Sequence, residues 1–453
     1  MNKKLVRFLT LAGMGALALA SLVATAQSGK QKVVWFVGVG TGGQPAQIDA
    51  EKAAAERYNK SQDKIDLDLQ IVDYNSARDN LSARIAAGNP PELVGPVGNQ
   101  GANWFKGQWV DMDPLVAKYK PDLSGIDPAL LKFYKESQEG TGLPYAVYPS
   151  FLYYNKDLFD EAKLPYPPTK FGDKYQGQTW DFSALRRLAM KLTCDSKGKI
   201  STDKDFDAKN IVTYGFINQW NLGVTAIGTG FKAAQIDQGG KAVIAPEWVD
   251  ALRYYHKAIW KDHFMPSQDA MNSDLLGKGN SLNSGNIAIG FTHLWYTCCL
   301  DGGPDAKLKH WGVAVVPSYK GKYTAKLHAD TFRIMKGSKN QEAAFQAMTW
   351  IFKQKDLLVA YGAFPADESL QDDYIAAVNK KYAVNAKINW QTVKDSLKYV
   401  DTPSAEQYVP NFTKVDDIFA KLGTKLVTLP DMNLSKEVEA TRAEIQRAFD
   451  EKK

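Results

Sequence analysis

Gly142-Leu143-Pro144 leads into Leu152-Tyr153-Tyr154-Asn155-Lys156-Asp157-Leu158-Phe159, and beyond a proline-rich loop Thr179-Trp180-Asp181 precedes a segment that ends at Lys191-Leu192-Thr193. The first part predicts a strand that passes into a helix, and the second predicts the start of another helix. Thr179 is a candidate N-cap, because its hydroxyl can accept a hydrogen bond from an unpaired amide of the first turn. Asp181 places a negative charge beside the positive end of the helix dipole.

Four segments before this stretch alternate between strand and helix patterns. Residues 32–37 are β-branched and aromatic, and residues 65–72 alternate apolar with polar side chains, as strands do. Residues 48–60 have the spacing of an amphipathic helix, and residues 76–87 form a second helical segment that stops at Gly88. Such alternation favours parallel sheets covered by helices, with ligands held at the carboxyl ends of the strands.

Length and composition predict a two-lobed protein without a nucleic-acid partner. The 453 residues are enough for two cores, because single cores stop growing at about 250 to 300 residues. The formal net charge is +6, of which residues 1–26 supply three positive charges, so the remainder carries about +3. No dense run of lysine and arginine occurs. The 11 Trp, 21 Tyr and 20 Phe offer planar faces for sugar rings, although many must fill cores.

The first 26 residues have the pattern of a signal peptide. Lys3, Lys4 and Arg7 form a positive region, residues 11–23 are an apolar core, and Ala24-Thr25-Ala26 is a cleavage site. The apolar core is shorter than the roughly 20 residues that a membrane-spanning helix needs. We expect an exported protein, periplasmic or otherwise extracytoplasmic and soluble after cleavage. An uncleaved signal anchor is the alternative, and no cysteine near the cleavage site suggests a lipid anchor.

The three cysteines predict one disulfide, because exported proteins meet an oxidising environment. Cys194 could pair with Cys298 or with Cys299, or these two neighbours could form a vicinal disulfide. We favour a bridge from Cys194, because vicinal disulfides are uncommon and strained. A metal site is not expected, since the five histidines show no ligand spacing and an adjacent Cys-Cys pair lacks the spacing of zinc motifs.

Further landmarks follow in a fixed order. Gly285-Asn286-Ile287-Ala288-Ile289-Gly290 runs on to Trp295, residues 311–317 form an apolar strand ending in proline, and Ser338-Lys339-Asn340-Gln341-Glu342-Ala343-Ala344 opens a helix. Together with residues 142–193, this order resembles the solute-binding subunits of bacterial ABC importers, specifically the sugar-binding family that includes maltose-binding proteins. The resemblance covers nearly the whole mature chain. Glu92 departs from it, standing where the family usually has Asp.

The resemblance implies a two-lobe α/β fold of the periplasmic-binding-protein type, type II-like. Each lobe would be a mostly parallel sheet flanked by helices, with a ligand cleft between the lobes. Lobe one would comprise residues 31–145 plus 317–358, and lobe two residues 146–316 plus 359–453. The implied function is capture of a sugar or oligosaccharide by hinge closure and delivery to the membrane permease of an ABC importer. The implied protein is a monomer with no catalytic activity.

Candidate ligand residues follow from the resemblance and from loops that end strands. Trp295 has the strongest positional support, as a platform on which a sugar ring stacks. For the polar candidates, amide, hydroxyl and carboxylate groups could replace the hydrogen bonds that sugar hydroxyls make with water. Their alternatives are a core position for Tyr148 and solvent-facing loop positions for the amides. The remaining candidates are Thr41, Gln44, Asn75, Asn99, Gln100, Tyr148, Asn218, Trp220, Asn221, Thr292, Asp330 and Thr331.

Gly38-Val39-Gly40-Thr41-Gly42-Gly43 invites a different interpretation, as a dinucleotide-binding turn. Glycines in such a turn let backbone amides approach an anion. Export removes the usual cofactor supply, so we expect no cofactor. The loop would instead place Thr41 or Gln44 beside ligand hydroxyls, or be a plain tight turn without ligand contact.

Two other functions compete with sugar binding. The same fold could bind a polyol, a glycerol phosphate compound or a peptide, although a phosphate would favour arginine and no candidate residue is arginine. A secreted carbohydrate-active enzyme would need two suitably spaced carboxyl groups, which 50 acidic residues cannot exclude. No nucleophile elbow, Ser/His/Asp signature or H-E-x-x-H helix is present, so binding without catalysis is favoured.

Overall fold

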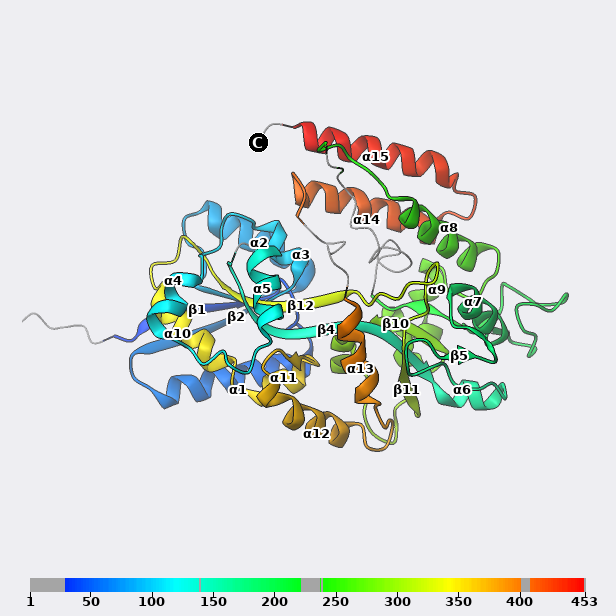
Figure 1. Ribbon diagram of the computed structural model, residues 1–453, viewed down its shortest axis with the longest axis horizontal. Helices are drawn as coiled ribbons and strands as arrows, with labels where there is room; N and C mark the ends of the chain where they lie inside the picture. Colours follow the sequence, from blue (N-terminus) through cyan, green and yellow to red (C-terminus); the bar gives the residue numbers. More distant parts are fainter. Residues whose placement is uncertain (1–28, 138–139, 221–236, 238, 401–407, 452–453) are drawn as a thin grey trace, which may run out of the picture.

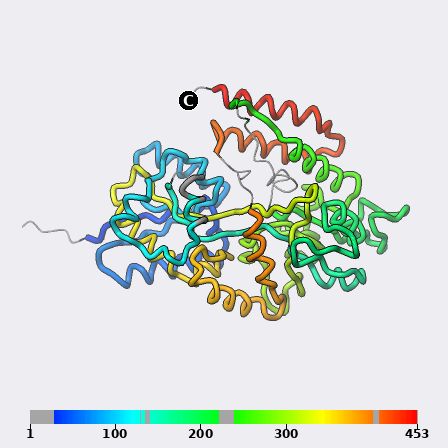
Figure 2. The backbone as a smooth tube through the Cα atoms, viewed as in Figure 1, coloured from blue at the N-terminus to red at the C-terminus, as the bar shows by residue number. Residues whose placement is uncertain are grey.

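The computed structural model describes residues 29–137, 140–220, 237, 239–400 and 408–451. The predicted signal peptide and Asn221 lie outside these residues. Two α/β lobes lie side by side and share two long strands that run between them (Figure 1). The chain passes from one lobe to the other and back, as the tube in Figure 2 shows. Among the described helices, none is long and apolar enough to cross a membrane.

The first lobe is built on three parallel strands: β1 (Gln31–Val37), β2 (Ile65–Ile71) and β3 (Leu93–Val97). The helices that follow them are α1 (Pro45–Ser61), α2 (Tyr74–Ala86) and α3 (Asn99–Trp104). Helix α1 starts at a proline, which suits a first turn because it has no amide to leave unpaired. The predicted alternation of strand and helix is confirmed here.

Strands β4 (Leu143–Asn155) and β12 (Leu327–Ile334) join the two lobes. All 13 residues of β4 are buried. Residues 143–149 of β4 pair antiparallel with β12, and residues 150–155 pair antiparallel with strands of the second lobe. The continuous order is β2-β1-β3-β12-β4-β10-β9, so a single strand carries hydrogen-bond ladders of both lobes.

The second lobe packs helices on β9 (Ile217–Asn218), β10 (Ile289–His293) and β11 (Trp311–Ala314). Helices α14 (Phe412–Thr428) and α15 (Leu434–Asp450) pack on α8 (Pro246–Trp260) in this lobe. In α14 the buried side chains recur at helical spacing, at Val415, Ile418, Phe419, Leu422 and Leu426. Each contributes roughly 1.5–3 kcal/mol by leaving water, so α14 is firmly docked on the second lobe.

The remaining elements surround these cores. Helices α11 (Lys355–Tyr361) and α12 (Gln371–Lys381) and strand β13 (Phe364–Pro365) lie beside the shared strands, and β13 pairs with residues 146–147 of β4. The other bounds are α4 (Asp113–Tyr119), α5 (Pro128–Ser137), α6 (Lys156–Glu161), β5 (Lys174–Tyr175), β6 (Gln178–Thr179), α7 (Phe182–Lys191), β7 (Cys194–Asp195), β8 (Ile211–Thr213), α9 (Gln268–Met271), α10 (Gln341–Ile351) and α13 (Trp390–Ser396).

Two predictions from the sequence are wrong. Asp181, and not Thr179, is the N-cap of α7, because the Asp181 carboxylate accepts a hydrogen bond from the Ala184 amide at 2.8 Å. Thr179 ends strand β6. The disulfide joins Cys298 to Cys299, and Cys194 is free, so the favoured Cys194 bridge is also wrong.

The physical reason for the cysteine pairing is that separate segments hold the thiols. Cys194 lies in β7, where its backbone pairs with Thr213 of β8. Cys298 and Cys299 end a 3₁₀ turn, residues 294–299, and the side-chain amides of Asn280 and Asn283 bind the Cys299 carbonyl. Neighbours in one turn therefore pair with each other.

Glu51 is a carboxyl buried inside the first lobe. It lies on the inner face of α1 and accepts a hydrogen bond from the Tyr361 hydroxyl at 2.8 Å. Its second oxygen has no hydrogen-bond partner among the described residues. Burial raises the pKa of Glu51 to about 8, and the Tyr361 hydrogen bond only partly offsets this.

This raised pKa predicts a pH-dependent stability. Folded Glu51 holds its proton at pH values where the unfolded chain has released it, so the folded state loses stability as the pH rises from about 4.5 to about 8. We expect the stability of the wild type minus that of Glu51→Gln to fall across this window, by a few kcal/mol at order of magnitude. Urea unfolding at a series of pH values measures it. A difference in stability between the two proteins that does not change with pH would show that Glu51 is solvated.

Candidate functional site

Polar groups from three segments, the loop after β1, strand β4 and strand β12, meet at Asp330, where β12 approaches the second lobe. The Tyr148 hydroxyl of β4 donates to Asp330 Oδ2 at 3.2 Å, and Thr41 donates to the same carboxylate through its hydroxyl and its backbone amide. Only 5% of Asp330 is exposed. Burial raises its pKa to about 6, against the opposing effects of the Thr41 hydrogen bonds, the nearby His328 and Tyr148.

Aromatic rings continue from this point into the second lobe. The rings of His328, in β12, and His293, at the end of β10, lie 4.1 Å apart between centroids. His293 lies nearly parallel to Trp295, with centroids 5.8 Å apart and planes 16° apart. Trp295 in turn lies parallel to Trp220, at 6.0 Å and 6°. We name the whole set the crossing row: Thr41, Tyr148, Asp330, His328, His293, Trp295 and Trp220.

The outer ring of the crossing row is fixed by its polar atom. Trp220 Nε1 donates to the Gly279 carbonyl at 2.9 Å, and the Trp220 backbone adopts a left-handed φ of 55°. An indole held by its N–H still presents its apolar face, and 47% of Trp220 is exposed. Trp220 therefore offers solvent a rigid aromatic surface beside Trp295.

Asn218 is a buried amide close to this surface. It lies two residues before Trp220, and its backbone pairs with Phe291 of β10. Although only 6% of it is exposed, neither its side-chain oxygen nor its nitrogen has a partner among the described residues. An unpaired buried polar group costs roughly 1–3 kcal/mol, so the site is suited to a bound molecule that satisfies the amide.

The loop after β1 owes its glycines to packing. A side chain at Gly40 would lie 2.4 Å from the Pro96 carbonyl oxygen, and one at Gly42 would lie 2.6 Å from Glu51 Oε1. Gly42 also has φ of 133°, which side chains disfavour. Close packing therefore accounts for these two glycines without an anion, and Thr41 between them reaches Asp330.

Of the predicted residues, the structure brings Thr41, Tyr148, Asp330, Trp295 and Trp220 into one row, with Asn218 beside it. Thr292 is buried on the opposite face of β10 from His293, and its hydroxyl has no partner among the described residues. Asn99 donates to the Leu327 carbonyl at 3.5 Å, so it lies close to the start of β12.

Four other predicted residues lie outside the crossing row. Gln44 is exposed, and the Gln47 side chain accepts a hydrogen bond from its backbone amide. Asn75 is exposed in the first turn of α2. The Thr331 hydroxyl binds the Val97 carbonyl and Arg333 within the first lobe. Gln100 binds α14, as described below.

The candidate residues named from the sequence did not include His328 or His293. The alternation of side chains along a strand could have identified His328, because side chains two residues apart in a strand share a face. His328 therefore shares the face of Asp330, which was a candidate, up to the bulge that follows Asp330. His293 lies opposite Ser150 in the adjoining pair of strands.

Two α/β lobes joined by shared strands, with hydrogen-bonding and aromatic side chains gathered where the strands cross, define a two-lobe binding protein. Residues 43–356 match the family described as bacterial extracellular solute-binding proteins, and the chain belongs to this family.

Individual relatives agree with this assignment. The chain is 24% identical over 350 residues to the arabinooligosaccharide-binding protein of Bacillus subtilis (strain 168), covering 76% of this chain and 75% of that protein. The ABC substrate-binding protein Lmo0181 from Listeria monocytogenes, solved in complex with cycloalternan, has a TM-score of 0.71 at 19% identity, covering 93% of this chain and 100% of that one. UgpB from Mycobacterium tuberculosis, in complex with glycerophosphocholine, has a TM-score of 0.68 at 15% identity, covering 92% of this chain and 98% of that one. These structures confirm the two-lobe fold.

Asp330 predicts a second pH effect, in a lower window than that of Glu51. Its pKa is raised from 3.8 to about 6, so the folded state loses stability from this group as the pH rises through that interval and no further above it. Relative to Asp330→Asn, the wild type should lose roughly 2–3 kcal/mol between these limits. Urea unfolding of both proteins measures the difference. A difference that does not change with pH would contradict a buried carboxyl at this position.

Proposed function

We propose that this protein is the substrate-binding subunit of an ABC importer and that it captures a sugar or oligosaccharide at the crossing row. The observation that carries the proposal is the continuity of the row from buried hydrogen-bonding groups in one lobe to parallel tryptophan rings in the other. Membership of the solute-binding family supports the transport role. The partners would be the carbohydrate and the membrane subunits of a permease, with the protein acting as a monomer.

The chemistry of the row suits a carbohydrate. A sugar has apolar ring faces and many hydroxyls, so it needs flat apolar surfaces and polar groups at the same time. Trp295 and the exposed face of Trp220 would cover ring faces. Asp330 would accept hydrogen bonds from hydroxyls, and the unpaired Asn218 amide could both donate and accept.

Capture would proceed by hinge bending between two lobes. We assign residues 31–145 plus 317–358 to lobe one and residues 146–316 plus 359–453 to lobe two. The bend would be concentrated in β4 a few residues beyond this boundary, near residues 149–150, where its pairing changes from β12 to β10. Closure would bury the ligand and create the shape that the permease recognises. Export by the signal peptide of residues 1–26 would bring the protein to the permease.

The same row argues against a phosphate ligand. Of the row's side chains, Asp330 can carry a negative charge and none is arginine or lysine, the residues that bind phosphate most strongly. The alternatives against which sugar binding should be tested are a polyol, a peptide and, although the row disfavours it, a glycerol phosphate compound. A secreted carbohydrate-active enzyme is a further alternative. It is distinguished by whether the bound compound is recovered cleaved or intact.

The test is thermal unfolding against a panel of monosaccharides, oligosaccharides, polyols and glycerol phosphates, with mass spectrometry of each compound after incubation. A ligand at a hundred times its Kd adds about 2.7 kcal/mol to the stability of the native state, which shifts the midpoint clearly. We expect a carbohydrate to stabilise the protein and to be recovered intact. Stabilisation by a non-carbohydrate alone would overturn the sugar assignment, and a cleaved product would indicate an enzyme.

Replacing Trp295 tests the aromatic half of the row. We expect Trp295→Ala to weaken binding of the stabilising carbohydrate about tenfold or more, because the ring face of the sugar loses its platform. Isothermal titration calorimetry measures the affinity. Tyr166→Ala is the matched control, since Tyr166 is a 40% exposed aromatic residue of the second lobe outside the row. Equal affinities for wild type and Trp295→Ala would remove Trp295 from the site.

A further inference from the structure

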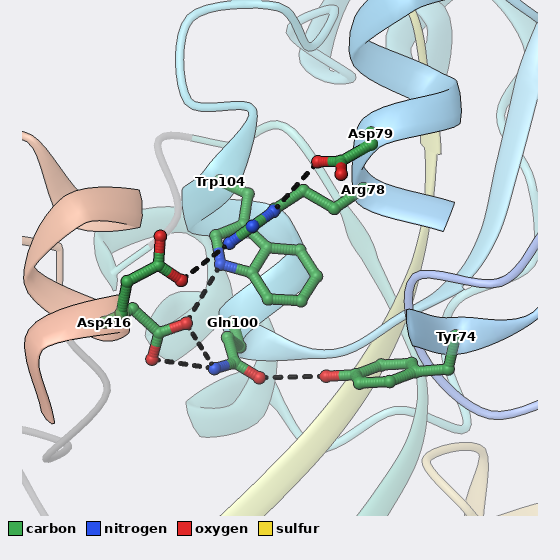
Figure 3. A network of polar contacts seen from close by, with 7 residues as sticks. Tyr74, Arg78, Asp79, Gln100, Trp104 and Asp416 are labelled. Atoms are coloured by element: carbon green, nitrogen blue, oxygen red, sulfur yellow. Dashed lines mark hydrogen bonds and ion pairs between the residues drawn. The ribbon is translucent and has the colours of Figure 1, made fainter. Parts of the chain in front are cut away.

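A second set of contacts joins the lobes away from the crossing row, between α3 and α14 (Figure 3). Gln100 Nε2 donates to both carboxylate oxygens of Asp416, at 2.8 Å and 2.7 Å. Trp104 Nε1 donates to Asp416 Oδ2 at 3.2 Å. Two side chains of the first lobe therefore converge on one carboxylate of the second.

Both polar atoms of the Gln100 side chain have hydrogen-bond partners in this contact between α3 and α14 and its neighbour α2. Its amide nitrogen is directed at Asp416, and its oxygen accepts a hydrogen bond from the Tyr74 hydroxyl at 2.9 Å. The sequence suggested Gln100 as a ligand contact. In the structure, the side chain instead links two helices of the first lobe to α14.

A salt bridge extends the contact. The Arg78 guanidinium lies over the Trp104 ring, 5.6 Å from its centroid, and Arg78 Nη1 lies 3.0 Å from Asp417 Oδ1. The Lys106 ammonium lies 4.0 Å from the centroid of the Tyr408 ring, just before α14. Cations and donors of the first lobe thus face an acidic pair and an aromatic ring of the second. This complementary charge favours the approach of α14 to α3.

The contact is an interlobe one because α14 is docked on the second lobe. Phe419 of α14 packs edge-to-face on Trp248 of α8, with centroids 5.4 Å apart. Asp416 and Asp417 lie on the side of the same helix that faces α2 and α3, because they pair with Gln100 of α3 and with Arg78 of α2. Opening of the lobes would therefore separate these pairs, unlike the hydrogen bonds of β4 and β12, which both lobes share.

We propose that Asp416 and Asp417, with Gln100, Trp104 and Arg78, form a closure latch that stabilises the closed arrangement of the lobes without touching the ligand. This proposal rests on the proposed function, in that it assigns the latch a role in ligand capture. The apparent Kd of a binding protein rises as the fraction of molecules in its binding-competent state falls. Asp416 is the principal element, because its hydrogen bonds are charge-assisted, whereas the half-exposed Arg78–Asp417 pair contributes less.

The test combines a measurement without ligand and one with it. Small-angle X-ray scattering of ligand-free wild type, Asp416→Ala and Gln100→Ala measures the separation of the lobes, and titration calorimetry with the carbohydrate that stabilises the wild type measures affinity. Glu437→Gln is the matched control, because Glu437 pairs with Lys425 between α15 and α14 inside the second lobe. Circular dichroism confirms folding of each variant.

We expect both alanine variants to have a larger radius of gyration than the wild type and about tenfold weaker affinity, and Glu437→Gln to match the wild type. The double variant should be no weaker than Asp416→Ala, because that single change already removes the contact with Gln100. Unchanged scattering of the alanine variants would overturn the latch. So would additive losses of affinity, because they would indicate that Gln100 contacts the sugar. If no carbohydrate binds, the scattering still decides the latch, while the proposed function fails separately.

Discussion

The pairing of β4 with β12 is the constraint on which the rest of the structure depends. Because β4 continues from the ladder of the first lobe into that of the second, side chains from both lobes are brought to one place by backbone hydrogen bonds. Tyr148 and Asp330 reach this place from the paired strands β4 and β12, and His293 reaches it from β10 of the second lobe. The strands hold Tyr148, Asp330, His328 and His293 in place within their own ladders, which lowers the conformational entropy that binding would cost.

The two ends of the row differ in chemistry for a physical reason. Asp330 is buried where Thr41 and Tyr148 supply donors, so the carboxylate is held in place yet has a raised pKa. Trp220 is fixed through its indole N–H and leaves its face exposed. A ligand that spans the row would meet a hydrogen-bonding end and an apolar end, as an amphipathic carbohydrate requires. The latch at Asp416 would act on a different quantity, the population of closed molecules, and would leave the chemistry of the row unchanged.

Features set by local sequence were predictable. The alternating strands and helices of the first lobe and the two-lobe fold follow from periodicity and from the order of short motifs. Trp295 was a candidate because of its place in one of these motifs, and its ring lies in the crossing row. Features set by contacts between distant parts of the sequence could not be predicted. Gln100 is 316 positions from Asp416, and no sequence pattern around either residue predicts that their side chains pair. Cysteine pairing likewise depends on which segments fold together, and the N-cap of α7 depends on where β6 ends.

The most direct test of the central claim is a crystal structure of the protein with the carbohydrate that stabilises it most. We predict that the sugar lies against Trp220 and Trp295, with hydroxyls hydrogen-bonded to Asp330 and to the Asn218 amide. A carbohydrate bound elsewhere on the protein, with the crossing row untouched, would contradict the account.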